Sequence, residues 1–325
     1  MPLTETVSIR DGYRMAPAAG PPLRSIGGEG QGGTAASPGS RESGERRIWE
    51  PPPPMTADDF AAIGGFIQAE FGIKMPPAKK TMLQSRLLKR LRAMNMSSYR
   101  QYREYLFSPE GMAHELPLMI DAVTTNKTDF FRERAHFDLL YETLLPAWFA
   151  RNGGRRKFAA WSAGCATGEE PYSMAMILSE FARIQPGFDF EVTGTDLSRE
   201  VVEKARQAIY PEAKTEAVPA DLKRRYFMRS RDRDKKLMRV VPELRRKVAF
   251  GCLNLMKPFS CPGKNDVVFC RNVVIYFERP LQEALFNRCC ECILPGGYLF
   301  IGHSETLGGM DLPLKQVFPT VYQRL

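Results

Sequence analysis

The sequence of 325 residues lacks the features that mark several large classes of protein. No apolar run approaches the roughly 18 residues that a membrane-spanning helix needs. The first residues, MPLTETVSIRDGYRM, have neither the basic start nor the apolar core of a signal peptide. Histidine is scarce (His114, His136 and His303), and no Ser-His-Asp or Cys-His catalytic arrangement is evident. We therefore expect a soluble cytoplasmic protein whose chemistry does not depend on a nucleophilic triad.

Cysteine is present in an odd number, seven, and most of these residues lie in apolar runs such as DVVFCRN and FNRCCECIL. This usage is typical of a reducing compartment. Cys289 and Cys292 form a C-x-x-C on an expected helix, but no second pair of ligands lies nearby in the sequence. We predict buried helix thiols there rather than zinc, and no metal in the protein.

Positive charge is in excess, with a formal net charge of +9 at pH 7. Such an excess indicates an acidic partner. Composition leaves open whether that partner is a nucleic acid, an anionic membrane or an acidic protein surface.

Residues 1–54 are rich in Gly, Pro, Ser and Arg, include the run GGEGQGG and end in PPPP. A segment of this kind buries too little apolar surface to offset its chain entropy. We predict a disordered tail over 1–54.

Residues 55–123 have helical periodicity and predict a small all-α domain. The run 79–103 carries eight cations and no acid. Its apolar residues fill one arc of a helix at about 100° per residue, namely Leu83, Leu87, Leu88, Leu91 and Met94. The opposite arc is a positive stripe that contains Arg86, Lys89, Arg90 and Arg92. One face is therefore expected in the core and the other at the surface.

After a linker over 124–155, strand-like and helical segments alternate to the end of the chain. Strands are expected at 157–164, 190–196, 247–255, 265–277 and 298–305, and helices at 169–184, 198–210 and 279–294. The alternation implies an α/β fold with a mostly parallel sheet and helices on both faces. It fails over about 211–246, where we predict an inserted subdomain formed as a small hairpin on the edge of the sheet.

The stretch WSAGCATGEEPYS, residues 161–173, places Gly164 and Gly168 between the first strand and its helix. A glycine loop there lets the backbone approach a ligand at the carboxyl ends of the strands, although a simple tight turn would also use two glycines. The next strand ends in Asp196, 28 residues after Gly168. A carboxylate in that place suits the two hydroxyls of an adenosine ribose, with a helix cap as the competing interpretation.

The ligand is unlike NAD or ATP, because the loop has neither G-x-G-x-x-G nor G-K-[ST]. Glu169 and Glu170 follow the loop at once and would repel phosphates. S-adenosylmethionine fits better, since it has no phosphate and carries an ammonium and a sulfonium that favour nearby acids.

Several motifs occur in one order along the chain: TTNKTDFFRE (124–133), SAGCATGEEPYSMAM (162–176), GTDLS, CLNLMKPF, DVVFCRNVVIYF and LPGGYLFIGHSE. From about residue 55 to the C-terminus, this order resembles the CheR-type protein-glutamate O-methyltransferases that act on chemotaxis receptors. The resemblance implies a Rossmann-like S-adenosylmethionine-dependent methyltransferase sheet over 156–325, with a small all-α N-terminal domain and a small inserted β subdomain. The linker would contribute to the cofactor site.

The resemblance also implies nine cofactor contacts, at Asn126, Thr128, Arg132, Glu169, Asp196, Asn254, Leu255, Arg271 and Asn272. The first three would close over the methionine end, Asp196 would bind the ribose, and Asn254 and Leu255 would form the adenine site. Arg271 and Asn272 would form the inner wall of the cleft. Each has a structural alternative, such as a turn cap for Asn126, a local backbone bond for Asn254 or an ion pair for Arg271. Of the two loop acids, we expect Glu169 to contact the cofactor and Glu170 to help start the helix.

The implied reaction is methyl transfer to glutamate side chains of methyl-accepting chemotaxis receptors. The acceptor is already an anion at neutral pH, so no general base is required and no catalytic residue is assigned. The basic stripe, represented by Arg86, Lys89 and Arg90, would dock on acidic receptor helices, although a solvated helix face is the plainer alternative. We expect a monomer that does not insert into the membrane.

Other interpretations stay open. In some relatives the inserted subdomain holds a receptor tether through a glycine-containing loop, but SRDRDKK has no glycine, so tether binding here is in doubt. A nucleic-acid methyltransferase would account for the basic charge, but the strand end CRNVVIYF lacks the N-P-P-Y-like pattern used with flipped bases. A non-catalytic module that senses cofactor or binds receptor is the third alternative.

Overall fold

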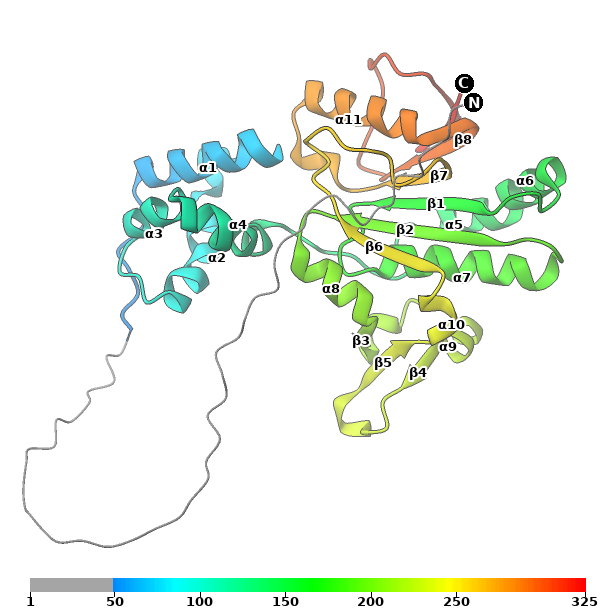
Figure 1. The fold of residues 1–325 in the computed structure, drawn as a ribbon, viewed down its shortest axis with the longest axis horizontal. Coiled ribbons are helices and arrows are strands. Elements are labelled where there is room, and N and C mark those ends of the chain that lie inside the picture. The colour runs from blue at the N-terminus through cyan, green and yellow to red at the C-terminus, as the bar shows by residue number, and fades with distance from the viewer. Residues whose placement is uncertain (1–48) are drawn as a thin grey trace, which may run out of the picture. The chain divides into compact units, whose positions relative to one another are not determined.

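The structure is a computed structural model that describes residues 49–325 (Figure 1). The tail expected to be disordered, 1–54, lies outside the described residues apart from 49–54. Within the described part of the chain, no helix has the length and apolar character needed to cross a membrane.

Residues 57–123 form the small all-α domain that the periodicity predicts. Its helices are α1 (Ala57–Phe71), α2 (Lys80–Ala93), α3 (Tyr99–Leu106) and α4 (Pro109–Val123), with a short 3-10 turn, η1 (Pro77–Lys79), before α2. Thr56 is the N-cap of α1, and its hydroxyl accepts a hydrogen bond from the Asp59 amide at 3.1 Å. Leu83, Leu87 and Leu91 are buried as predicted, whereas Leu88 and Met94 are half-buried.

A buried carboxylate, Glu115 of α4, ties three helices of this domain together. Arg90 of α2 donates to both of its oxygens, at 2.8 and 2.7 Å, and the Tyr102 hydroxyl of α3 donates at 2.8 Å. Burial is the main cause of the raised pKa of Tyr102; the Glu115 charge and the hydrogen bond to Glu115 raise it further, and the Arg90 charge opposes the rise. The positive stripe on α2 is therefore partly an internal structural element.

The α/β domain begins with a continuous helical stretch and continues as alternating strands and helices. The stretch is α5 (Ala135–Leu139), a π-helical turn η2 (Leu140–Leu144) and α6 (Leu145–Asn152). The alternating elements are β1 (Phe158–Ala163), α7 (Glu169–Ile184), β2 (Phe190–Asp196), α8 (Arg199–Gln207), β6 (Val248–Cys252), β7 (Asn265–Cys270), η5 (Val274–Tyr276), α11 (Arg279–Cys292) and β8 (Ile293–Ile301). Two strands that the sequence analysis did not predict, β9 (Leu314–Phe318) and β10 (Val321–Arg324), complete the chain.

The main sheet has seven strands in the order β6-β2-β1-β7-β8-β10-β9. The first five are parallel, and β10 and β9 are added in antiparallel fashion. Alternate side chains of β7 enter two different cores: Val267 and Phe269 pack with α7, and Val268 and Cys270 pack with α11. Helices therefore cover both faces, as predicted, and Figure 1 shows the sheet between α11 and α7.

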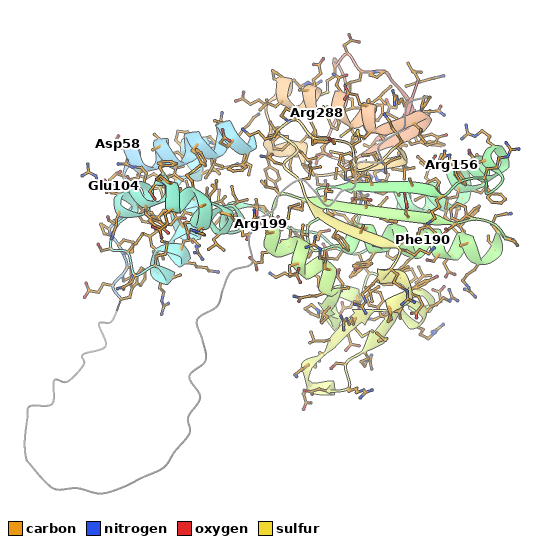
Figure 2. All side chains as sticks on the ribbon, viewed as in Figure 1. Asp58, Glu104, Arg156, Phe190, Arg199 and Arg288 are labelled. Carbon is orange, nitrogen blue, oxygen red and sulfur yellow. A yellow bond between two sulfur atoms is a disulfide. The ribbon has the colours of Figure 1, made fainter. Side chains whose placement is uncertain are left out.

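At the amino ends of the strands, an ion pair joins the partly exposed Arg156 to the buried Asp266. Arg156, which is labelled in Figure 2, donates to both oxygens of Asp266, at 2.7 and 2.6 Å. Trp148 and the backbone N–H of Ala159 donate to the same carboxylate. The Asp266 carboxylate is thereby engaged in structural contacts at this end of the sheet.

The inserted subdomain differs in form from the predicted hairpin on the sheet edge. It has its own antiparallel sheet of three strands in the order β3-β5-β4, which does not pair with the main sheet. Its elements are β3 (Ile209–Pro211), η3 (Glu212–Thr215), α9 (Ala220–Tyr226), β4 (Phe227–Arg229), η4 (Arg233–Lys235), β5 (Leu237–Val240) and α10 (Pro242–Arg245). The predicted helix 198–210 ends early for the same reason, because Ile209 and Tyr210 pair with β5.

Two expectations about local structure were wrong. The segment 265–277 is a strand only as far as Cys270, because the following residues turn toward the helical domain and form η5. Cys292 is not a free helix thiol but forms a disulfide with Cys261, since the loop between β6 and β7 crosses the end of α11. Cys289 is free and buried, as expected.

The Glu115 contacts predict that Arg90 is needed for stability. Replacing it in Arg90→Met leaves a buried carboxylate without its charged partner, and we expect the free energy of unfolding in urea to fall by about 2 kcal/mol. Lys89→Met, at the exposed neighbouring position of the same helix, is the matched control and should change it by less than about 0.5 kcal/mol. Equal effects of the two variants would contradict a special role for the Arg90–Glu115 pair.

Candidate functional site

A cavity of about 370 Å³ lies between the helical domain and the carboxyl ends of the parallel strands. From the helical domain it is lined by Phe71, Ile73, Met75, Lys79, Met82 and Arg86. Val123 at the end of α4, the linker residues 124–128 and 132, Glu170 at the start of α7 and the loops that follow β1, β2, β6 and β7 complete the lining. Its position agrees with the general rule that ligands of parallel sheets bind outside the carboxyl ends of the strands.

The two domains are joined by hydrogen bonds around this cavity. The Asn254 amide donates to the Glu70 carbonyl at 3.2 Å, and the Lys74 N–H donates to the Tyr276 carbonyl at 3.0 Å. Lys257 forms an ion pair with the Glu70 carboxylate at 2.7 Å. The end of α1 is thereby attached to the loops that form one wall of the cavity.

The glycine loop needs both of its glycines. Gly164 and Gly168 have φ values of 84° and 95°, in the region that disfavours other residues. A Cβ on Gly164 would lie 2.4 Å from a methyl carbon of Val273, and one on Gly168 would lie 2.8 Å from the Ala205 Cβ. The loop is thus tightly packed as well as left-handed, and Gly164 lines the cavity.

Asp196 lies at the end of β2 and lines the cavity. Its two oxygens accept hydrogen bonds from the backbone N–H groups of Ala166 and Ser198, at 2.9 and 3.0 Å. Burial raises the pKa of Asp196, and these backbone bonds oppose the rise. Ser198 caps α8, so the competing role of Asp196 as the helix cap is not needed. The Ser198 hydroxyl also donates to Asp121 of α4 at 2.6 Å, which connects this strand end to the helical domain.

The two acids after the glycine loop lie in different surroundings. Glu169 is buried outside the cavity lining and accepts from the Thr167 hydroxyl at 2.6 Å. Burial raises the pKa of Glu169, although the bond from Thr167 opposes that rise. Glu170 lines the cavity and accepts from the Ser162 hydroxyl and from Arg271, both at 2.7 Å.

Arg271 is a buried guanidinium in the wall of the cavity, with a side chain that is 1% exposed. Besides Glu170, it contacts Glu133 at 3.4 Å, donates to the Arg132 carbonyl at 2.8 Å and donates to His136 Nδ1 at 2.8 Å. It is therefore the structural ion pair that the sequence left as an alternative, and it also lines the cavity.

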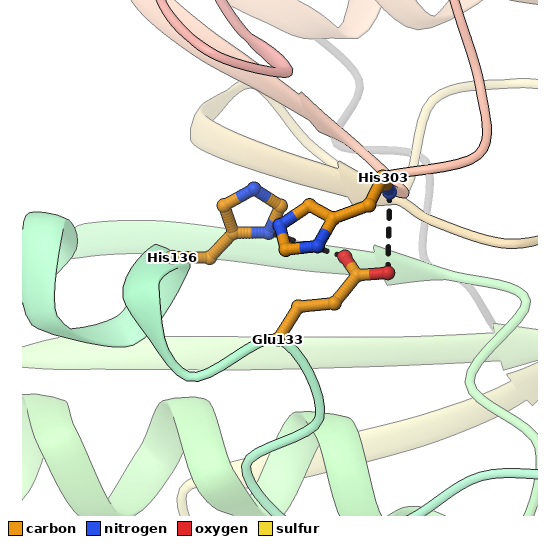
Figure 3. Close-up of side chains that lie close together, drawn as sticks. All are labelled: Glu133, His136 and His303. Atoms are coloured by element: carbon orange, nitrogen blue, oxygen red, sulfur yellow. Dashed lines mark hydrogen bonds and ion pairs between the residues drawn. The ribbon is translucent and has the colours of Figure 1, made fainter.

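Glu133, His136 and His303 come together beside Arg271, with ligand-type atoms within 4.8 Å of one another (Figure 3). Arg271 can only donate, so His136 Nδ1 accepts, and the Nε2–H donates to the Thr320 hydroxyl at 2.8 Å. Burial and the Arg271 charge lower the pKa of His136 to about 4, so the ring is neutral. The lone pair that a metal would need is already used by a cation, which makes this cluster a hydrogen-bond network.

Glu133 is also connected to the loop after β7 and to the last parallel strand. It accepts from the Asn272 amide at 3.4 Å and from the His303 N–H at 3.2 Å. Burial would raise the pKa of Glu133, but the His303 bond and the Arg271 charge outweigh it and the pKa is lowered. The carboxylate is therefore ionised in its place between the linker and the sheet.

Eight of the nine predicted cofactor residues line the cavity together: Asn126, Thr128, Arg132, Asp196, Asn254, Leu255, Arg271 and Asn272. Glu169 does not. The side chain of Asn254 is committed to the Glu70 carbonyl and to the Met256 N–H, which is the local bond anticipated as its alternative. Asn126 donates to the Thr124 hydroxyl at 3.1 Å, a turn contact of the kind also anticipated.

The three residues of the proposed docking stripe have different roles in the structure. Arg86 lines the cavity and donates to the carbonyls of Val123 and Thr124, so it joins α2 to the linker. Arg90 is paired with Glu115, and Lys89 is exposed. The structure does not gather them into one free surface.

Sequence reasoning missed Glu305, Tyr276 and Lys79. The buried Glu305 carboxylate accepts from the backbone N–H groups of Gly302, Asn272 and Val274 and so shapes the loop after β7. Tyr276 and Lys79 line the cavity from opposite domains, with the Lys79 ammonium 5.9 Å from the Tyr276 ring. For Glu305, the only signal in the sequence was an acidic residue in GHSE, just after the last parallel strand.

The sheet, the glycine loop and the cavity at the strand ends define an α/β domain of the S-adenosylmethionine-dependent methyltransferase class, joined to a helical domain. Residues 126–323 match the family described as CheR methyltransferase, SAM binding domain, and residues 58–124 match CheR methyltransferase, all-alpha domain. The chain belongs to the CheR methyltransferase family. The predicted fold class, resemblance and cofactor, S-adenosylmethionine, are thereby confirmed.

Curated relatives cover most of the chain. Chemotaxis protein methyltransferase 2 of Pseudomonas aeruginosa is 37% identical over 270 residues, which are 82% of this chain and 93% of that protein. The chemotaxis protein methyltransferase of Salmonella typhimurium is 37% identical over 264 residues, 81% of this chain and 88% of that protein. The Escherichia coli protein of the same name is 36% identical over 264 residues, 81% and 89% of the two chains.

The lowered pKa of His136 predicts a loss of stability in mild acid. Below about pH 6.5 the unfolded chain binds a proton at this residue, whereas the folded protein does so only near its pKa of about 4. Between these values the contribution of His136 to the free energy of unfolding should fall by about 3 kcal/mol. Urea unfolding of wild type and His136→Gln across this range measures it, because the variant should lack the loss.

His114→Gln, at an exposed position of α4, is the control and should keep the acid-induced loss. An NMR titration that places the His136 pKa near 6.5 would contradict the neutral, cation-bound ring.

Proposed function

We propose that this chain transfers the methyl group of S-adenosylmethionine to glutamate side-chain carboxylates of methyl-accepting chemotaxis receptors, with glutamate methyl esters as the product. The observation that carries the proposal is the cavity lining, which combines acids suited to a cationic cofactor with cations suited to an acidic substrate. The relatives named chemotaxis protein methyltransferase support the same assignment.

The cavity suits S-adenosylmethionine in size and chemistry. Its volume of about 370 Å³ is within the usual range for small-molecule sites. Leu197, Leu253 and Leu255 offer apolar contact, and Asp196 and Glu170 offer negative charge. We assign the ribose to Asp196, the adenine to the loop 253–256, and the methionine end to Asn126, Thr128 and Arg132.

We assign the contact with the positively charged groups of the cofactor to Glu170 rather than to Glu169. Only Glu170 of the two lines the cavity, and its carboxylate is held in place by Ser162 and Arg271. Glu169 is buried and bonded to Thr167, so it stabilises the glycine loop on the side away from the cavity.

Methyl transfer to a carboxylate requires that the two reactants be positioned, and it requires no acid-base catalysis. S-adenosylmethionine supplies, when bound, an electrophilic methyl group on a sulfonium. A glutamate side chain, with an ordinary pKa near 4.3, is already a carboxylate nucleophile at neutral pH. The chain's own residues therefore have to hold both partners in a shared, water-poor cavity, and orientation of this kind can lower a barrier considerably.

The helical wall of the cavity is suited to an acidic substrate. Lys79 and Arg86 reach the lining from this side, while the sheet side holds Asp196 and Glu170. Burial, together with the charges of Arg86 and Lys74, lowers the pKa of Lys79. A carboxylate beside Lys79 would relieve this repulsion between cations, so the arrangement favours an incoming glutamate.

Labelling with tritiated S-adenosylmethionine in the presence of receptor-bearing membranes tests the function. We expect base-labile label on receptor protein, because methyl esters hydrolyse in base. Label on RNA would instead support a nucleic-acid methyltransferase, and no label on any macromolecule would support a non-catalytic binding module.

Asp196→Ala is the site-directed arm of that experiment. Loss of the ribose acid should weaken binding of S-adenosylhomocysteine at least about tenfold in calorimetry and remove the label. Asp221→Ala, an exposed acid on α9, is the matched control and should bind and label like wild type. Unchanged affinity in Asp196→Ala would remove the ribose assignment.

Lys89 tests docking without disturbing the core, because it is the exposed member of the stripe. We expect Lys89→Glu to raise the KM for receptor about 3- to 10-fold, more at low salt, while cofactor affinity stays the same. Steady-state kinetics at two salt concentrations measures this. Lys315→Glu, on the exposed edge strand β9, controls for the change of net charge, and an equal effect there would refute docking through α2.

A further inference from the structure

The inserted subdomain contacts two of the segments that line the cavity, the linker and the glycine loop. Lys214, on η3 of this subdomain, donates from its ammonium to the Thr128 carbonyl and to the Asp129 carboxylate, both at 2.8 Å. Thr128 is buried and lines the cavity. A residue from the insertion thus reaches the backbone of the linker at a position that lines the cavity.

Aromatic packing reinforces the same contact. Phe130 of the linker is buried edge-on against Tyr210 of β3, at 4.9 Å between ring centroids, and against Phe227 of β4, at 5.4 Å. The Tyr210 hydroxyl also donates to the Thr167 carbonyl in the glycine loop at 2.8 Å. Two strands of the insertion therefore hold the linker and the glycine loop at once.

The backbone around Lys214 is held in place by other residues of the insertion. The Glu212 N–H donates to the Lys236 carbonyl at 2.8 Å, and the Thr215 hydroxyl, which is fully buried, donates to the Glu212 carbonyl at 2.7 Å. The ammonium is therefore presented from a rigid turn, which is a requirement for a residue that positions another.

The linker needs such support because its backbone is strained. Phe131 and Glu133, neither of them glycine, have φ values of 54° and 55°. Left-handed conformations of this kind cost energy and persist only where the surroundings hold them. From the other side, the Phe131 N–H donates to Ser173 of α7 at 3.0 Å, so the linker is held between α7 and the insertion.

We propose that Lys214 is a positioning residue for the cofactor site, which holds the Thr128 backbone against the cavity, and that the inserted subdomain is thereby a structural part of that site. The inference rests on the proposed assignment of Thr128 to the cofactor. The insertion then has a role in this chain that does not depend on binding a receptor tether.

Calorimetry with S-adenosylhomocysteine tests the proposal on the full chain. Lys214→Met removes the ammonium but keeps most of the side-chain length, and we expect the dissociation constant to rise about 5- to 10-fold. In kinetics, the KM for S-adenosylmethionine should rise while the KM for receptor is unchanged, a split that a general loss of folded protein would not produce. Lys214→Arg keeps a donor and should restore most of the affinity.

Two control variants separate this role from surface charge. Lys204→Met breaks an ion pair on α8 in which both partners are also about half exposed, and it should leave the affinity unchanged. Asp129→Asn removes the ion pair of Lys214 but leaves its bond to the Thr128 carbonyl, so it should change the affinity less than about twofold. An effect of either variant as large as that of Lys214→Met overturns the proposal.

Thr128→Ala distinguishes failure of the inference from failure of the site. If Lys214 acts through Thr128, the double variant should bind little worse than Thr128→Ala alone, and additive effects overturn the inference. If Thr128→Ala weakens binding but Lys214→Met does not, the inference fails and the site assignment stands. If neither Thr128→Ala nor Asp196→Ala weakens binding, the site assignment itself fails, and the inference with it.

Discussion

The buried guanidinium of Arg271 is the interaction on which the arrangement of the cavity depends. A charge taken out of water is costly unless partners surround it, and here they come from two separate stretches of chain. Glu170 approaches from the start of α7, while Glu133, His136 and the Arg132 carbonyl approach from the linker. The rings of Phe137 and Phe269 lie 5.4 and 5.1 Å from the guanidinium carbon and shield it from solvent. The linker and the glycine loop are therefore held at the end of β7 by one group.

This arrangement explains how the loop can carry two acids and still bind a ligand. Glu170 faces the cavity but shares its charge with Arg271, and Glu169 is turned away to the Thr167 hydroxyl. The cavity has Asp196, Glu170 and the paired Arg271 on the sheet side and, on the helical side, the charges of Lys79 and Arg86, which have no ion-pair partner among the described residues, so it is polarised. That polarity suits a cationic methyl donor and an anionic acceptor, and it would be a poor environment for a phosphate.

Much of the fold followed from local patterns. β2 occupies the predicted residues 190–196, and α7 the predicted 169–184, because in both segments the periodicity and the flanking residues agree. Eight of the nine cofactor residues lie on one cavity, since strand ends and the linker motif converge there in any parallel sheet of this order. The expectations failed where distant segments decide: β10 is a short strand that forms only by pairing with β8, β9 is the edge strand beside it, and Cys261 meets Cys292 only because a loop crosses α11.

The sequence by itself determined the alternation of strands and helices, the two glycines, Asp196 at a strand end and the family, because each depends on residues that are neighbours in the chain. Only the tertiary structure decided which acid faces the cavity, that Arg90 is paired with Glu115, and that the insertion forms its own sheet against the linker. The physical reason is that the sequence gives the charge of each side chain, whereas the packing of distant segments decides which partner that charge meets. For Arg271 that partner set spans more than a hundred residues of sequence, from Glu133 and Glu170 to the end of β7.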